Sequence, residues 1–299
     1  MIAFASLADK KLADEICKEI SKQGILYRID YDPSTNQYIL LVDKEENIGV
    51  ALDIYRVMLG LPRQFEQSEE WSKIQSVSMG PVTMVVVAFC IGIFILGDYK
   101  IVPELYTLMQ LSPDFFTDFN IMNVWKLVTP VFIHFGIIHI LFNMMWMKDL
   151  GKVVEAQRGG NFLIFFIFLV GAFSNAAQFF SIGPNFGGMS GVIYGLLGYL
   201  WMNKRFNKNS EYSLAKQDIY IMVGWFFLCL SGALSFSIAN MAHAMGLSLG
   251  MLVGIFFGMS ESKEEKQWTA VAGYFVFALA LPIFTQFIEL FKLSMKSGA

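Results

Sequence analysis

The sequence predicts an α-helical polytopic membrane protein with a small α+β domain at its N-terminal end. Three observations predict this class. Of the 299 residues, 55% are hydrophobic and the mean hydropathy is +0.52, which is too apolar for a water-soluble domain of this size. From residue 80 onward, uncharged stretches recur at the length of a membrane-spanning helix. The first 62 residues have the mixed composition of ordinary soluble sequence.

The N-terminal domain is predicted over residues 1–62, in βαββα order. An apolar run precedes an amphipathic stretch at 8–23, two strand-like runs at 25–31 and 37–42 flank turn residues, and a helical stretch follows at 47–59. We expect a regulatory or stabilising cytosolic domain, because so short a segment supports little chemistry. A charged linker is predicted at 63–79, with Trp71 as an interfacial anchor. The N-terminus lacks the pattern of a secretory signal.

Seven membrane-spanning segments are predicted, the first of them at 81–97. The others lie at 134–154, 161–181, 190–203, 218–236, 241–259 and 268–289. The fourth segment is short, which fits a helix surrounded by protein. The domains are thus a membrane domain at 80–259 and an additional hydrophobic helix and tail at 260–299. We favour a span for the last segment over a helix lying on the membrane surface, although a span places Lys292 and Lys296 outside.

Positive charges predict the orientation. Basic residues lie at or just past the end of the second segment, between the fourth and fifth and between the sixth and seventh, and the opposite connections nearly lack them. The basic residues are Lys148, Lys152, Arg158, Lys204, Arg205, Lys208, Lys216, Lys263 and Lys266. The N-terminal domain is therefore expected in the cytosol. The starts of segments two, four and six are expected in the outer half of the bilayer.

Charge and cysteine content exclude other classes. The net charge is −3 and no basic run is long enough for a nucleic-acid surface, so nucleic acid is not an expected partner. Cys17, Cys90 and Cys229 lie far apart, which supports neither a disulfide framework nor a metal site. No cofactor is expected, and the sequence predicts no oligomeric state.

Two predicted helices carry stripes of glycine that leave one face bare. The stripes are Gly191, Gly195 and Gly198 in the fourth segment and Gly246, Gly250 and Gly254 in the sixth. Ser190 opens the fourth segment, and His243 shares the face of the glycine stripe in the sixth. If the bare faces pack together, Ser190 meets His243 in the arrangement of a nucleophile and a general base.

Other polar residues gather at the same predicted end. All three histidines of the chain, His134, His139 and His243, lie toward the outer ends of apolar segments. Such residues indicate function by default, although a neighbouring backbone carbonyl can equally satisfy a histidine. Asn143 follows His139 by one helical turn, so both can donate into one cavity; hydrogen bonding between helices is the other interpretation of Asn143.

Acidic residues are absent from 119–148, 159–210 and 219–260. A Ser-His-Asp triad built from these segments is therefore excluded, and a serine mechanism requires a dyad of Ser190 and His243. Tyr194, one turn after Ser190, is a candidate stacking platform for the imidazole.

The runs WKLVTPVFIHFGIIHILFN, GPNFGGMSGVIYG and ANMAHAMGLSLG resemble the rhomboid family of intramembrane serine proteases, and within it the bacterial GlpG type. The resemblance covers about residues 80–259 and extends to the soluble domain. It implies a six-span bundle in the bacterial inner membrane, surrounded by membrane lipids. It also implies transmembrane proteins as substrates.

The resemblance implies a role for each candidate residue. Ser190 is the nucleophile and His243 the general base, with Tyr194 packed on the imidazole and Gly188 in support. Asn143, His139 and the Ser190 backbone N–H form the oxyanion hole. The positions with a structural role are Trp125, His134, Glu155 and Arg158.

Two departures from the family pattern keep alternatives open. Lys126 follows Trp125 where the family usually has arginine, and lysine lacks the planar fork that makes bidentate bonds. The GlpG type also ends after six spans. A pseudoprotease that binds membrane helices without cutting them is the main alternative. A small transporter is the other, but it expects an internal repeat and a charge at mid-membrane, which the sequence lacks.

Overall fold

The computed structural model describes residues 1–61, 68–117, 120–234, 238–263, 265 and 267–297. The chain divides into two compact units, Met1–Gln67 and Ser68–Ala299. The first unit contains a sheet and two helices, and the second is helical in the part that the structure describes.

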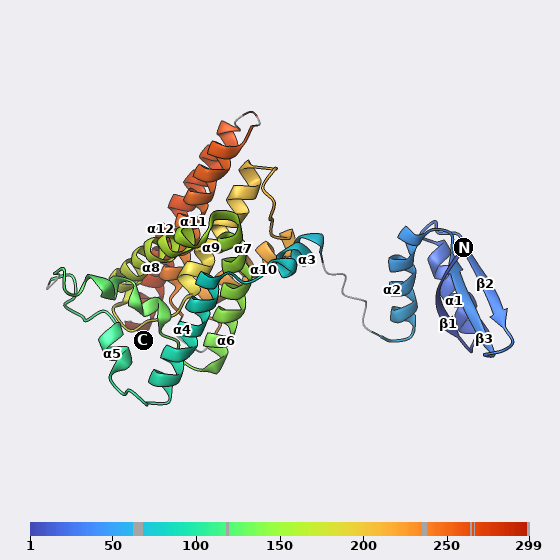
Figure 1. Ribbon diagram of the computed structural model, residues 1–299, viewed down its shortest axis with the longest axis horizontal. Coiled ribbons are helices and arrows are strands. Elements are labelled where there is room, and N and C mark those ends of the chain that lie inside the picture. Colours follow the sequence, from blue (N-terminus) through green and yellow to red (C-terminus); the bar gives the residue numbers. More distant parts are fainter. Residues whose placement is uncertain (62–67, 118–119, 235–237, 264, 266, 298–299) are drawn as a thin grey trace. The chain divides into compact units, whose positions relative to one another are not determined.

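The first unit has the expected βαββα order (Figure 1). Its elements are β1 Ile2–Leu7, α1 Lys10–Ser21, β2 Tyr27–Asp32, β3 Gln37–Val42 and α2 Ile48–Met58. The strands form an antiparallel sheet in the order β1-β3-β2, with Val42 opposite both Ile2 and Tyr27. Asp9 caps α1 by accepting from two backbone N–H groups. Because α1 is amphipathic, its apolar face covers β3 and makes a small core of its own.

The second unit contains ten helices among its described residues (Figure 1). They are α3 Glu69–Ser76, α4 Pro81–Asp98, α5 Leu105–Met109, α6 Ile137–Trp146, α7 Lys152–Arg158, α8 Gly160–Ile182, α9 Ser190–Phe206, α10 Lys216–Ser231, α11 Asn240–Glu261 and α12 Trp268–Ser297. Short 3₁₀ turns lie at Glu45–Asn47 in the first unit and at Val124–Leu127 and Thr129–Phe132 in the second, and a π-helical turn, Met147–Gly151, joins α6 to α7.

Four helices within the described residues are long and apolar enough to cross a membrane, namely α4, α8, α11 and α12. At 17 and 16 residues, α9 and α10 are shorter. The second predicted segment is divided among α6, the π-helical turn and α7. Several apolar helices therefore form the expected membrane bundle, and the count of seven spans stays a prediction.

Three helix boundaries differ from expectation. The second segment begins at Ile137 rather than 134, because Gly136 before it has a φ of 82° that ends the preceding extended chain. His134 thus precedes the helix. Helix α10 ends at Ser231, before the expected 236, and α12 runs on to Ser297, beyond 289. The Trp71 ring packs on Trp146 at 6.2 Å within the second unit.

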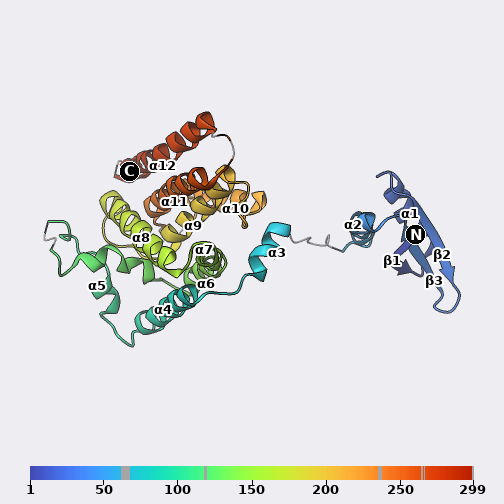
Figure 2. The same ribbon diagram turned by 45° about the horizontal axis from the view of Figure 1, so that its top comes forward.

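Helix α11 lies at the centre of the second unit, in contact with α8, α9 and α12 (Figure 2). Its contact with α9 runs through glycine, as the two stripes predict. A Cβ atom at Gly246 would overlap the carbonyl oxygen of Gly191, and one at Gly250 would overlap that of Gly195. The two backbones therefore touch directly, which only glycine permits.

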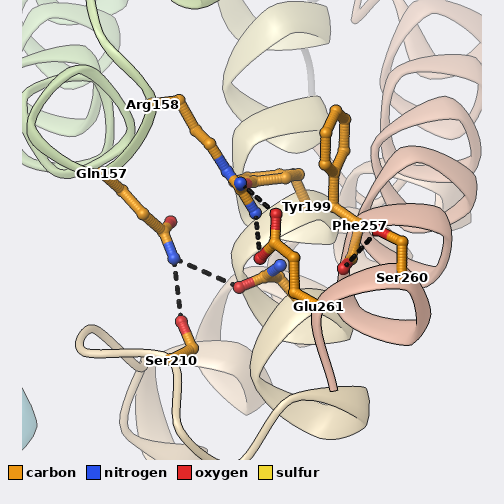
Figure 3. A network of polar contacts seen from close by, with 8 residues as sticks. Gln157, Arg158, Tyr199, Ser210, Phe257, Ser260 and Glu261 are labelled. Carbon is orange, nitrogen blue, oxygen red and sulfur yellow. Dashed lines mark hydrogen bonds and ion pairs between the residues drawn. The ribbon is translucent and has the colours of Figure 1, made fainter. Parts of the chain in front are cut away.

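A polar network joins α7, α9 and α11 at the ends far from Ser190 and His243 (Figure 3). Arg158 donates two hydrogen bonds to the Glu261 carboxylate and one to the Tyr199 hydroxyl. Beside it, Gln157 donates to Asn203 at 3.2 Å and to Ser210 at 2.8 Å. A charge-assisted bidentate pair holds its partners in a defined orientation, so the network fixes these helix ends.

Candidate active site

The site centres on the contact between Ser190 and His243. His243 Nε2 lies 2.7 Å from Ser190 Oγ, although 53 residues separate them in the chain. Ser190 is the first residue of α9 and is half-buried, whereas His243 lies in the first turn of α11 and is 6% exposed. At this distance a neutral imidazole accepts the hydroxyl proton, as a general base must.

The register of α9 against α11 produces this contact. Gly246 meets Gly191, Gly250 meets Gly195 and Gly254 meets Tyr199, which is a constant offset of 55 residues between two parallel helices. Because close-packed backbones interlock, the helices cannot slide past one another without losing every contact. The first turns of both helices therefore stay level, and the serine and the histidine at those turns face each other.

Tyr194 supports the imidazole from one side. Its ring centroid lies 4.8 Å from that of His243 at an interplanar angle of 35°. Its hydroxyl donates to the Met222 carbonyl of α10 at 3.1 Å. The phenol is 4% exposed, so packing and this hydrogen bond both fix the ring on which the imidazole rests.

His139 lies beside the loop that precedes Ser190. Its Nδ1 accepts from the Phe135 N–H at 3.3 Å, which puts the proton of a neutral ring on Nε2. A Cβ atom at Gly188 would lie 2.7 Å from that Nε2 and 3.8 Å from Ser190 Oγ. Gly188, with a φ of 125°, is therefore needed both for the backbone conformation and for the space that His139 occupies.

The Asn143 side chain is hydrogen-bonded within its own helix. Its side chain is 5% exposed, and its Nδ2 donates to the His139 carbonyl of its own helix at 2.9 Å. No hydrogen bond joins Asn143 to Ser190 among the described residues. The amide has a second N–H, which remains its means of reaching an oxygen at the site.

His134 holds the loop directly before Ser190. The ring is fully buried; its Nδ1 pairs with the Phe132 carbonyl at 3.2 Å, and its Nε2 accepts from the Met189 N–H at 3.4 Å. Gly188 N–H donates to the Pro130 carbonyl at 3.0 Å. The two bonds connect the segment before α6 to the segment before α9, which agrees with the structural role that the resemblance implies.

Polar residues that the sequence interpretation left out also hold the site. Gln178 of α8 is 1% exposed, and its Oε1 accepts from the Ala242 N–H in the first turn of α11 at 3.1 Å. Glu289 of α12 accepts from Asn240 in the same turn at 2.9 Å. The signal for Gln178 is an uncharged polar residue within an apolar segment, which membrane helices rarely carry without a partner.

The remaining candidates lie elsewhere. Trp125 is 45% exposed, with its indole N–H on the Met122 carbonyl and the Lys126 ammonium 5.7 Å from the ring centroid. Glu155 accepts from the N–H groups of Val82 and Thr83 and so caps α4. The described residues contain no group of three or more metal-ligating side chains.

Known proteins are similar to this chain over much of its length. The family described as Rhomboid domain matches residues 122–260. The rhomboid protease GlpG of Yersinia enterocolitica serotype O:8 is 33% identical over 286 residues, which cover 89% of this chain and 100% of that protein. GlpG of Yersinia pestis (strain Pestoides F) and of Yersinia pseudotuberculosis serotype O:3 is 34% identical over 181 residues, 59% of this chain. Those 181 residues span 63% of the length of these two relatives.

Proposed function

The chain belongs to the rhomboid family, and from this we propose that it is an intramembrane serine endopeptidase. Its substrates are membrane proteins, cut in or next to their transmembrane segments. The observation that carries the proposal is the 2.7 Å contact between His243 Nε2 and Ser190 Oγ. The names of the similar proteins support the reaction class.

The mechanism uses a dyad. Ser190 Oγ attacks the carbonyl carbon of the scissile peptide, and His243 Nε2 takes the hydroxyl proton and gives it to the leaving amine. An acyl-enzyme forms. His243 then takes a proton from water, whose oxygen attacks the ester, and returns that proton to Ser190 Oγ as the second product is released. Tyr194 keeps the imidazole in place by ring packing, whereas in a triad a carboxylate orients it through a hydrogen bond.

The oxyanion that develops in each step needs hydrogen-bond donors. Two of the proposed donors are the Ser190 backbone N–H and His139 Nε2–H, because His139 Nε2 lies against Gly188, two residues before Ser190. Asn143 is the third proposed donor, and its second N–H has to turn toward the oxyanion. Donors placed where charge develops stabilise the transition state more than the substrate.

The protein is a multi-pass membrane protein, and we place it in the bacterial inner membrane. Its N-terminal domain lies in the cytosol and the active site opens to the outer side, as the basic residues in α7 and at the end of α9 favour. The connections 98–123 and 236–240 control access of water and substrate. Residues 118–119 and 235–237 of these connections lie outside the described residues. Substrate helices must unwind locally, because a helix hides its carbonyls in its own hydrogen bonds.

A serine-directed fluorophosphonate probe on the detergent-solubilised protein tests the proposal. The wild type is expected to be labelled and Ser190→Ala not, since the probe reacts with an activated hydroxyl. Ser260→Ala is the matched control, because Ser260 is exposed at the opposite end of α11, and it should label like the wild type. Equal labelling of wild type and Ser190→Ala, or labelling of neither, would favour a pseudoprotease. Co-expression with single-span proteins then maps the cut.

A further inference from the structure

The C-terminal helix α12 brings a carboxylate back to the end of α11 that carries His243. Glu289 Oε1 accepts from Asn240 Nδ2 at 2.9 Å, and Asn240 is the first residue of α11. Twenty-one residues separate Asn240 from Glu261 in α11, and as many separate Trp268 from Glu289 in α12. Each stretch is about 32 Å of helix. Since α12 runs back along α11, equal lengths put Glu289 level with the start of α11.

The contact lies in a partly buried, charge-balanced environment. Asn240 is 5% exposed, and the Glu289 side chain is 15% exposed. Lys292 Nζ lies 2.9 Å from the same Glu289 oxygen. A carboxylate removed from water is stable only when it is paired, and here an ammonium and an amide N–H pair it. The positive end of the α11 dipole also favours a negative charge at this place.

Two side chains from different helices hold the first turn of α11. Gln178 of α8 accepts from the Ala242 N–H, and Glu289 of α12 holds Asn240. His243 follows directly. Its backbone position therefore depends on α8 and α12 as well as on the glycine contact with α9.

The imidazole itself has few other restraints. His243 Nδ1 and Asn240 Oδ1 are buried and have no hydrogen-bond partner among the described residues. In a Ser-His-Asp triad a carboxylate holds the second ring nitrogen, and no such bond orients His243 here. The placement of its ring rests on Tyr194 and on the first turn of α11.

We propose that Glu289 is a positioning residue for His243 and acts through Asn240. The inference rests on the proposed protease function and assigns part of the general base's alignment to α12, which the resemblance treats as an addition to the family bundle. When Glu289 is lost, the first turn of α11 loses one of its two side-chain anchors. The imidazole then samples positions less favourable for taking the Ser190 proton. The chemical step therefore becomes slower, which lowers kcat, whereas substrate binding does not change.

The test compares Glu289→Ala, Glu289→Gln and the full-length wild type on a single-span substrate. A misplacement of about 1 Å at a reacting group costs roughly 100-fold, so Glu289→Ala should lower kcat by about 10- to 100-fold with KM unchanged. Glu289→Gln retains an oxygen that accepts from Asn240 and should stay within about threefold of the wild type. Glu265→Ala removes an exposed carboxylate three residues before the start of α12 and should change nothing.

The rate of fluorophosphonate labelling provides a second readout, because it reports hydroxyl activation without substrate binding. It should fall with Glu289→Ala and recover with Glu289→Gln. An active wild type with an equally fast Glu289→Ala overturns the inference, as does a loss of activity that only raises KM or that matches a lowered unfolding temperature. If Glu289→Ala and Glu289→Gln lose activity equally, Glu289 does not act through its hydrogen bond with Asn240. A wild type without Ser190-dependent cleavage refutes the proposed function instead.

Discussion

His134 shows how one side chain connects parts of the site that lie far apart in the chain. Its two ring nitrogens contact the Phe132 carbonyl and the Met189 N–H, so the loop before Ser190 is fixed to the loop before α6. Such a ring has to be neutral, since Nε2 accepts while Nδ1 donates. A protonated His134 would lose its acceptor and release the peptide that leads to the nucleophile.

The Asn143→Ala variant tests the contribution of a single residue to the oxyanion hole. Removing one oxyanion-hole donor costs about 100- to 1,000-fold in turnover, so Asn143→Ala should retain weak, measurable cleavage with an unchanged labelling site. The steady-state kcat on a single-span substrate measures the effect. Phe142→Ala is the control, because Phe142 is on the same helix, 57% exposed and facing away from the core. A normal kcat for Asn143→Ala would remove Asn143 from the proposed oxyanion hole.

Site residues can be predicted from the sequence only where the chemistry of the site allows few residue types. A serine and a histidine at the starts of two glycine-lined helices are restricted in this way, and they meet as the stripes predict. The partners of Gln178 and Glu289 could not be predicted, because an amide or a carboxylate forms equivalent bonds with many groups. Only the packing of α8 and α12 on α11 selects Ala242 and Asn240.

At the scale of elements, α9 and α11 act as one body. Their constant register depends on positions where any side chain would strike a backbone carbonyl. Glycine periodicity alone predicts this pair of helices, since bare faces pack closely. Helix ends were harder to predict: α6 begins three residues after the expected 134, because a positive φ at Gly136 redirects the chain, and the π-helical turn Met147–Gly151 has no sequence signature.

Gly250→Ala tests this contact. A methyl group there overlaps the Gly195 carbonyl, and overpacking of this kind costs about 1–3 kcal/mol or more. We expect a lower unfolding temperature in detergent and a loss of fluorophosphonate labelling, because α11 has to move away from α9. Gly92→Ala in α4 is the matched control, since nothing lies within 4 Å of its added methyl group. Similar unfolding temperatures for the two variants would contradict direct backbone packing.

At the scale of the whole molecule, each of the two compact units has its own apolar core. The composition change near residue 80 predicts a soluble part and a membrane part, because uncharged apolar stretches as long as a membrane-spanning helix are most stable within a bilayer. A regulatory or stabilising role is expected for the soluble part, but its partner could not be predicted, since its residues carry no recognisable constellation of reactive groups. We propose that it is an independent domain.

Residues 1–67 expressed alone should therefore fold cooperatively. Cys17 is a probe of this, because it is fully buried, and burial, reinforced by the nearby Asp14, raises the pKa of its thiol to about 11. Only thiolate reacts with alkylating agents, so at pH 8 the native domain should resist modification and the urea-unfolded chain should react. Mass spectrometry measures the extent of Cys17 modification across a series of urea concentrations. Fast modification without urea would show that these residues do not fold by themselves.

The parallel register of α9 and α11 also has a consequence for biosynthesis. The ribosome makes Ser190 53 residues before His243, and Glu289 comes later still. Under the proposed function, a nascent chain has an alcohol without its base until α11 has entered the membrane. An unfinished copy without α11 therefore does not cut other newly inserted proteins around the translocon, and enzymatic activity begins only once α11 has packed on α9.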